Sequence, residues 1–493
     1  MQDRQASDLT NKTTFRTYKQ AQKALDRVHE IYARMTRRIE DRFKAFLAGQ
    51  HSGDPVKDAY YPEIRVSVDA DALVYDARPS WGTLPYPGRY ATTMTQPELF
   101  HEYYLAQLER LAAYHGVPFE VGVSDRPIPL PFVVDEATTQ LDPETIRALQ
   151  AIFVMPNLGD IDDSIANGTF PTAANQVRPL SLFPADRIDL AIQRIHHYTG
   201  THARYFQNFM LFTNYKRYVD SFIAHGRTLA ASGGGDEGYT AFVEPGGVVT
   251  TPETGMPPDD LPMPLQQMPA YHLMRRDCLG ITLINIGVGP SNAKTITDHL
   301  AALRPHCWLM IGHCGGLRRS QQLGDYVLAH AYERQDHVLD NDLPVSVPVP
   351  PIAEVQVALQ DAVSRITGLS GQDLKSRMRT GTVVTTDDRN WELRFDDLYS
   401  RFNRSRAIAV DMESATIAAN GFRFRVPYGT LLCVSDKPLH GEIKLRGMAD
   451  TFYRQRIDQH LQIGLETVRI LRERGVNQLH SRKLRAFDEP PFQ

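Results

Sequence analysis

The chain has 493 residues, 42% hydrophobic and 23% charged, and a formal net charge of −4. This length allows two or three domains with substantial cores, and the composition is that of an ordinary soluble globular protein rather than a disordered one. Nucleic-acid-binding proteins usually carry a basic excess, which is absent, so we expect no nucleic acid as a partner.

No run of about 20 apolar residues is present, so we expect no membrane span. The N-terminal stretch also lacks the apolar core of a secretion signal, which predicts a cytoplasmic protein. The cysteines are scattered and form no Cys-x-x-Cys pair of the kind that binds zinc; they are Cys278, Cys307, Cys314 and Cys433. We therefore expect reduced thiols and no metal site, and no organic cofactor is implied.

Residues 1–175 are predicted to form a smaller α+β domain. Apolar residues recur every three or four positions from Leu25 to Phe46, which predicts one long amphipathic helix. An alternating strand over Ile64–Val68 and a second helix over about Glu98–His115 follow. A stretch rich in proline and aspartate after Met155 places the domain boundary near residue 175.

The polar face of the long helix is strongly basic, with Arg27, Arg34, Arg37, Arg38 and Lys44. A solvated face explains this pattern. An anion site and a subunit contact are the alternatives. The turn from Trp81 to Arg89 is likewise compatible with an anionic effector.

Residues 176–493 are predicted to form a larger α/β domain. Helical and aromatic residues dominate from Ala185 to His225, and Ser232–Pro269 carries seven glycines and seven prolines, which predicts a long loop or an intersubunit arm. From Gly280 onward, short apolar strands alternate with helices. That alternation predicts a mixed, mostly parallel central sheet flanked by helices.

Two strand-like runs near the C-terminus end in acidic residues. They are Ile408–Ala415, which contains Glu413, and Leu431–Pro438, which contains Asp436. A buried strand that stops at a carboxylate delivers that group to the carboxyl edge of the sheet, where open α/β folds bind their ligands. Glu413 and Asp436 are therefore the first site candidates, with helix capping as the alternative for each.

Two glycine-containing loops follow earlier strands. The segment Gly280–Ala293 runs from a strand through Gly289 into a helix, and Met310–Arg318 ends a strand at Gly312-His-Cys-Gly315. Backbone N–H groups in such loops can meet an anion. Each loop alone is equally consistent with a structural turn.

These four segments, in this order, resemble the signatures of the hexameric-type nucleoside phosphorylase and nucleosidase superfamily. Within it, Gly312–Arg318 and Phe212–Val219 look like the AMP nucleosidases, which also carry an extra N-terminal domain. The resemblance implies a nucleoside-phosphorylase-like fold for residues 176–493. It also implies that AMP is hydrolysed at its N-glycosidic bond to give adenine and ribose 5-phosphate.

The resemblance assigns roles to the strand-end residues. Asp436, beside Ser435, protonates the departing purine, and Glu413, beside Met412, holds the ribose. Partial burial is expected to raise the pKa of Asp436 toward a usable value. Asp411 matches an acidic family position of less certain role.

The same resemblance implies further substrate contacts. Gly289, Gly315 and His313 belong to the matching loops, and Thr385–Trp391 occupies the position of the base-stacking residue. Trp391 or Arg389 is the candidate there, with a core tryptophan as the alternative. The 5′-phosphate requires cations, and the unranked candidates are Lys216, Arg217, Lys294, Arg318 and Arg319.

The chain departs from the phosphorylases at Met310 and His313, where those enzymes carry an arginine and a serine that grip inorganic phosphate. This difference favours water as the nucleophile. Purine nucleoside phosphorolysis and a non-catalytic nucleotide sensor remain the alternatives. The base that activates water is not identified. The resemblance further implies a homohexamer, activated by ATP and inhibited by phosphate, with residues 1–175 as the regulatory part.

Overall fold

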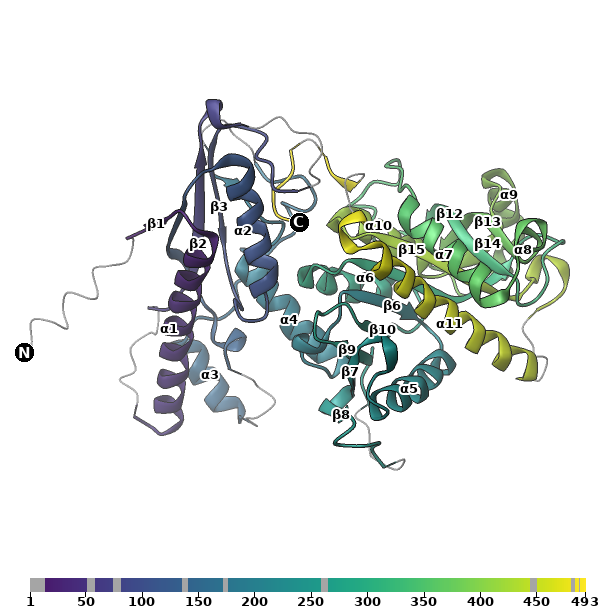
Figure 1. Cartoon of the computed structure of the whole chain (residues 1–493), viewed down its shortest axis with the longest axis horizontal. Coiled ribbons are helices and arrows are strands. Elements are labelled where there is room, and N and C mark those ends of the chain that lie inside the picture. Colours follow the sequence, from purple (N-terminus) through teal and green to yellow (C-terminus); the bar gives the residue numbers. More distant parts are fainter. Residues whose placement is uncertain are drawn as a thin grey trace, which may run out of the picture. The chain divides into compact units, whose positions relative to one another are not determined.

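The computed structural model describes residues 14–50, 58–73, 81–134, 141–171, 176–258, 265–443, 450–479, 484–486 and 488–493 (Figure 1). The chain forms two compact units, Met1–Gln193 with Arg485–Gln493, and Arg194–Leu484. Residues 172–175 lie outside the described residues. The domain boundary expected near residue 175 therefore stays a prediction. The two-domain α/β fold class is confirmed.

The first unit contains a five-stranded sheet, within the described residues, in the order β1-β4-β2-β3-β5. These strands are β1 (Arg16–Tyr18), β4 (Phe119–Pro127), β2 (Tyr60–Val68), β3 (Gly88–Thr93) and β5 (Arg178–Pro179). Its helices are α1 (Ala21–Leu47), α2 (His101–His115) and α3 (Pro143–Ile152), and α4 (Ala185–Thr199) contains the point where the two units divide.

Helix α1 lies against β2 and β4. Its apolar positions are buried, including Val28, Ile31 and Ile39, as the predicted periodicity requires. Arg34, Arg37 and Arg38 on the opposite face are exposed, whereas the Arg27 side chain is only 12% exposed and pairs with Glu30 at 2.6 Å. The predicted long amphipathic helix is therefore present.

The second unit contains a mixed sheet that, within the described residues, has ten strands in the order β14-β13-β12-β15-β11-β6-β10-β9-β7-β8. The strands are β6 (Phe209–Thr213), β7 (Tyr239–Glu244), β8 (Val248–Thr250), β9 (Ala270–Arg275), β10 (Ile281–Asn285), β11 (Cys307–Gly316), β12 (Tyr326–Gln335), β13 (Met378–Thr386), β14 (Ala409–Asp411) and β15 (Tyr428–Asp436).

The pairing directions decide where the strand ends meet. Strands β10, β6, β11 and β15 are parallel neighbours, so their carboxyl ends lie along one edge. Strands β12, β13 and β14 are parallel to one another, but β12 runs antiparallel to β15. Strand β14 also pairs antiparallel with β11, which closes these five strands into a ring. The first residue of β14, Ala409, pairs with Gly316 at the carboxyl end of β11.

Helices cover this sheet (Figure 1). Helix α11 lies against α7 and α5, and α10 lies against α6. The bounds are α5 (Lys216–Ala231), α6 (Pro290–Leu300), α7 (Ala353–Thr367), α8 (Gly371–Arg377), α9 (Phe395–Ser405), α10 (Ser414–Phe424) and α11 (Asp450–Arg474). None of the helices within the described ranges is long and apolar enough to cross a membrane.

Two stretches contain strands that the sequence interpretation did not place. The stretch read as helical contains β6, a fully buried strand whose continuous apolar run carries no alternation to distinguish it from a buried helix. The stretch read as a long loop contains β7 and β8, which pair with each other at the end of the sheet. The glycines that suggested a loop include Gly246, which makes the tight connection between these strands with φ of 81°.

Candidate functional site

Glu413 lies at the edge where several strand ends converge. It immediately precedes α10, and its side chain is only 1% exposed. The backbone N–H of Gly289 donates to Glu413 Oε1 at 2.7 Å, and Asn214 Nδ2 donates to Oε2 at 3.0 Å. The carboxylate is thus held between the loop after β10 and the end of β6.

Burial, and after it the neighbouring charge of Asp411, together raise the pKa of Glu413 to about 8, while the bonds from Gly289 and Asn214 oppose the shift. Glu413 directly precedes α10, yet no side-chain cap bond from it is formed among the described residues. The carboxylate instead reaches across to the neighbouring strands, so desolvation dominates its ionisation.

Asp411 stabilises the start of α10. Its Oδ2 accepts from the backbone N–H and the hydroxyl of Ser414, with the backbone bond at 2.9 Å, and its Oδ1 accepts from Thr385 Oγ1 at 2.6 Å. The Thr385 hydroxyl oxygen in turn accepts from the N–H of Ala415 at 2.8 Å. Both carboxylate oxygens therefore serve the helix terminus, and Met412 lies half-buried between Asp411 and Glu413.

Asn214 did not appear among the residues predicted from sequence. It follows β6 directly, within the Phe212–Val219 segment that carried part of the resemblance. Its Oδ1 is buried without a hydrogen-bond partner among the described residues, while its Nδ2 binds Glu413. A polar residue directly after a buried strand was the available signal, and it was missed because β6 was read as helical.

Asp436 ends β15 and is half-buried. The Ser435 hydroxyl donates to Asp436 Oδ1 and also lies 3.3 Å from the carbonyl oxygen of Cys314 on β11. Gly315 is the register partner of Asp436 across a local irregularity of the two parallel strands. A Cβ at Gly315 would come within 3.1 Å of Val410, so a larger residue would crowd the start of β14.

His313 is buried in β11 and packs against two tyrosine rings. Its ring centroid lies 4.2 Å from that of Tyr215 and 5.6 Å from that of Tyr218. Met310, earlier in the same strand, is fully buried. The positions that hold phosphate in phosphorylases are thus occupied by a thioether and by a histidine packed between aromatic rings.

Trp391 and Arg389 have different environments in the structure. Trp391 is 6% exposed and belongs to a hydrophobic cluster with Leu317 and Val384, and its ring lies 5.4 Å from that of Phe402 in edge-to-face contact. Arg389 is exposed.

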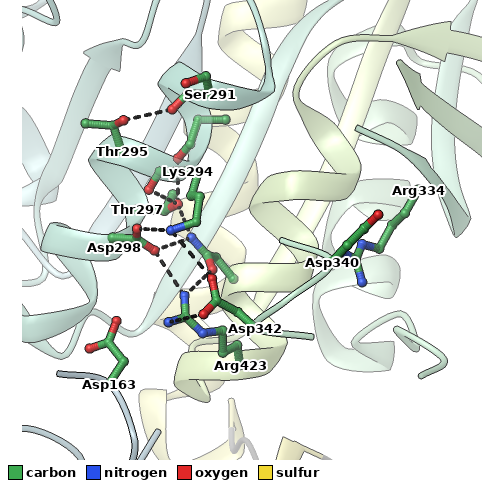
Figure 2. Close-up of polar contacts among 12 residues, drawn as sticks. Asp163, Ser291, Lys294, Thr295, Thr297, Asp298, Arg334, Asp340, Asp342 and Arg423 are labelled. Carbon is green, nitrogen blue, oxygen red and sulfur yellow. Dashed lines mark hydrogen bonds and ion pairs between the residues drawn. The ribbon is translucent and has the colours of Figure 1, made fainter. Parts of the chain in front are cut away.

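The predicted phosphate-binding cations are dispersed. Lys294 pairs with Asp298 at 2.6 Å, and Arg423 contacts the same carboxylate at 3.1 Å, as Figure 2 shows. Lys216 pairs with Asp220 at 2.6 Å. Arg217, at the start of α5, is exposed close to Asn214 in sequence, and Arg318 lines a separate pocket beyond β11.

Within the part of the chain that the structure describes, no group of three or more histidine, cysteine or acidic side chains is arranged to hold a metal ion. The four cysteines are free thiols, and three of them are buried while Cys278 is exposed. Burial raises the pKa of the Cys433 thiol to about 12, so it stays protonated at neutral pH.

Two family models match the chain. The model described as the bacterial AMP nucleoside phosphorylase N-terminus matches residues 23–177, and the phosphorylase superfamily model matches residues 278–468. AMP nucleosidase from Escherichia coli strain K12 is 53% identical over 436 residues, which cover 88% of this chain and 89% of that protein, and the O157:H7 protein gives the same values. A guanosine phosphorylase from Halorubrum lacusprofundi is 23% identical over 34% of this chain and 66% of that protein.

Similar solved structures include an AMP nucleosidase from Bacteroides thetaiotaomicron, with 30% identity and a TM-score of 0.42 over 58% of this chain and 98% of that one. A purine nucleoside phosphorylase from Toxoplasma gondii in complex with immucillin-H has 18% identity and a TM-score of 0.40, over 56% of this chain and 98% of that chain.

Proposed function

Because this chain belongs to the AMP nucleosidase family, we infer that it hydrolyses the N-glycosidic bond of AMP to adenine and ribose 5-phosphate. It is an enzyme, a nucleosidase. The observation within the structure that supports this activity best is the buried Glu413, held by Gly289 and Asn214 at the edge where Asp436 also ends its strand.

Breaking this bond leaves a sugar with oxocarbenium character and sends the bonding electron pair to the purine. In our proposal, the Asp436 carboxyl gives its proton to the departing base, so adenine leaves neutral, and water adds its oxygen to the anomeric carbon. The hydrogen bond from Ser435 orients the Asp436 carboxyl group. No residue is assigned as the base that receives the proton of water.

Glu413 is proposed to bind the ribose hydroxyl groups in its ionised form. A carboxylate there fixes the sugar and supports the positive charge that develops on its ring. Met412 precedes it in the chain and is half-buried, which suits packing against the ribose. Gly289 and Gly315 contribute close backbone approach at the ends of β10 and β11, where a side chain would obstruct the ligand.

Water is proposed as the nucleophile rather than inorganic phosphate. Met310 is buried and has no hydrogen-bond donor, and His313 packs between Tyr215 and Tyr218. The cation and hydroxyl that phosphorolysis requires are therefore replaced by groups suited to packing. Tyr215, whose ring packs against His313, is the residue directly after Asn214, which contacts Glu413.

For the 5′-phosphate we retain Arg217 as the first candidate, because it is exposed three residues after Asn214. Lys294 and Lys216 are engaged with aspartates. Arg319 also stays a candidate, whereas Arg318 lines a separate pocket. Trp391 and Arg389 stay the proposed base-stacking residues.

From the family resemblance we further propose a homohexamer whose activity is raised by ATP and lowered by phosphate, with the N-terminal domain as the regulatory part. A solution mass near six times 55.6 kDa is expected for the assembled enzyme. A cytoplasmic location also stays a prediction.

The direct test is to incubate the purified protein with AMP in phosphate-free buffer, with and without ATP, and to identify the products by chromatography. Adenine with ribose 5-phosphate is expected, and stimulation by ATP would support the proposed control. Adenine formed only after phosphate is added would indicate a phosphorylase. No adenine under any condition would instead support a non-catalytic nucleotide sensor.

A further inference from the structure

A pocket of about 370 Å³ lies beside the amino end of β13. It is lined by Arg318, Gln321, Lys375, Met378, Arg379, Thr380 and Ile408. Three of these seven side chains are cationic and none is acidic. We propose that this pocket binds an oxyanion, namely the phosphoryl group of inorganic phosphate or of a small phosphate monoester.

Gln321 gives the pocket a buried donor. Gln321 is only 1% exposed, and its side-chain Oε1 accepts a hydrogen bond from the backbone N–H of Arg318 at 2.9 Å. Its Nε2 is buried with no hydrogen-bond partner among the described residues. A buried amide donor left unsatisfied is costly, so an acceptor from a ligand is the natural complement.

Arg379 is a second donor at the pocket, and its guanidinium group is fixed by contacts with Ser320. Its Nη1 lies 3.3 Å from Ser320 Oγ, and its Nη2 donates to the Ser320 carbonyl oxygen at 3.0 Å. Its Nε is buried without an acceptor in the part of the chain that the structure describes. An anchored guanidinium with an unused N–H is well suited to an oxyanion, because charge-assisted hydrogen bonds to phosphate are the strong ones.

The pocket lies away from Asp411 and Glu413. Thr380 lines the pocket, whereas Thr385, five residues along the same strand, binds Asp411. At about 3.3 Å per strand residue, these positions lie roughly 16 Å apart. Ile408 lines the pocket just before β14, and Asp411 ends that strand. The anion site therefore lies at the opposite ends of β13 and β14 from Glu413.

One hydrogen bond connects the pocket with the strand that carries Asp436. Lys437 Nζ donates to the carbonyl oxygen of Gln321 at 2.9 Å. A ligand that binds the Gln321 side chain therefore contacts a residue that is hydrogen-bonded to Lys437, and Lys437 directly follows Asp436 in the chain. Through this contact a bound anion can influence the strand that carries Asp436. The binding of the anion itself does not depend on the proposed catalytic roles.

The size of the pocket is at the lower end for small-molecule sites, which span about 300–1,000 Å³. It accommodates an inorganic phosphate ion with room for a short organic group. The two sources share the phosphoryl group, and titration with inorganic phosphate and with glycerol phosphate distinguishes them.

The test is calorimetric titration of the full chain with each compound at constant ionic strength. Lys375→Gln and Arg379→Gln are each expected to weaken binding about tenfold, the loss typical of one charge-assisted hydrogen bond. Arg276→Gln is the control, because Arg276 is exposed, has no proposed role in substrate binding and lies outside the lining. This control should bind like the wild type.

Thermal unfolding of each variant checks that the fold is intact, and Lys375→Arg should restore binding if charge is what matters. The site is supported if the wild type binds either compound and both Gln variants weaken that binding. The compound that binds more tightly shows whether the phosphoryl group comes from inorganic phosphate or from a phosphate monoester. Failure of the wild type to bind either compound would overturn the proposal. The proposal would also be overturned if Lys375→Gln and Arg379→Gln bound the compounds as tightly as the Arg276→Gln control does.

Discussion

Asp411 and Glu413 lie in one turn but have different environments. Their carboxylates therefore make different contacts. Asp411 accepts hydrogen bonds from Ser414 and Thr385 and stabilises the start of α10. Glu413 receives donors from other strands and points to the sheet edge. Helix capping was the alternative for Glu413, and the contacts show that Asp411 makes this cap instead.

Asp436→Asn tests the proposed general acid. The amide keeps the shape of the side chain and its neighbour Ser435, but it has no acidic proton to give to the purine. We expect kcat for AMP to fall by about 10²-fold or more, the usual contribution of general acid catalysis, with AMP binding largely retained. Undiminished turnover by steady-state kinetics would contradict the assignment.

The pKa of Glu413 predicts a pH dependence. Because burial raises this pKa to about 8, the proposed ionised form is scarce near pH 6 and increases as the pH rises through 8. We expect kcat/KM for AMP, which reports the free enzyme, to increase over that range. In Glu413→Gln this rise should disappear and kcat/KM should be low throughout; an unchanged profile in the variant would exclude Glu413 as its source.

Asn214 is predicted to position Glu413 and to favour its charged form. Asn214→Leu removes the donor to Oε2 at similar volume, so the pKa of Glu413 should increase. The rising limb of kcat/KM should then move to higher pH. A purely structural role would reduce thermal stability without moving that limb, so the pH profile separates the two. Asn390→Ala, at an exposed position, serves as the control.

At the level of elements, β15 carries Asp436 between β11 and β12 and is covered by α7. Gly429 within β15 allows this close approach. A Cβ there would lie 2.4 Å from Val355 Cγ1 and 3.0 Å from Leu359 Cδ1, both in α7. Small residues in this strand are therefore required by the packing of the helix above it.

Gly429→Ala is expected to lower the free energy of unfolding by about 1–3 kcal/mol, the usual cost of overpacking a core. Denaturant unfolding measures the change. Gly159→Ala provides the comparison, because its Cβ would only reach ordinary contact with Asn157 at 3.4 Å. Equal stabilities of the two variants would show that α7 can move away from β15.

At the scale of the whole molecule, each unit has its own core. The first unit buries Asp189 at 1% exposure, where Tyr61 donates to Oδ2 at 2.7 Å and Thr95 donates to Oδ1 at 2.8 Å. Desolvation nevertheless raises the pKa of Asp189 to about 7. This buried acid ties the start of α4 to β2 and to the segment after β3.

A carboxyl whose folded pKa is raised above its unfolded value of about 3.9 favours folding most strongly when both states are protonated. The first unit should therefore lose stability as the pH rises from about 4 to 7. Asp189→Asn keeps most of the hydrogen-bonding capacity without the charge, so its thermal unfolding should lack this contribution. An identical pH dependence in wild type and variant would contradict the assignment.

Local sequence patterns were sufficient to predict several features. The three- and four-residue spacing predicted α1, because a helix repeats its faces over a few neighbouring positions. The acids after apolar runs indicated Glu413 and Asp436, because a strand carries its next residue to the sheet edge. The same rule would have found Asn214 had β6 been recognised.

Only the tertiary structure decided which of these residues meet. Asn214 and Gly289 lie 199 and 124 positions from Glu413, and they contact it because β6 and β10 are parallel neighbours and β14 turns back onto β11. Strand order also separates Arg318 from the Glu413 contacts. Local periodicity depends on adjacent residues, whereas these contacts depend on how distant strands pair, which no short pattern encodes.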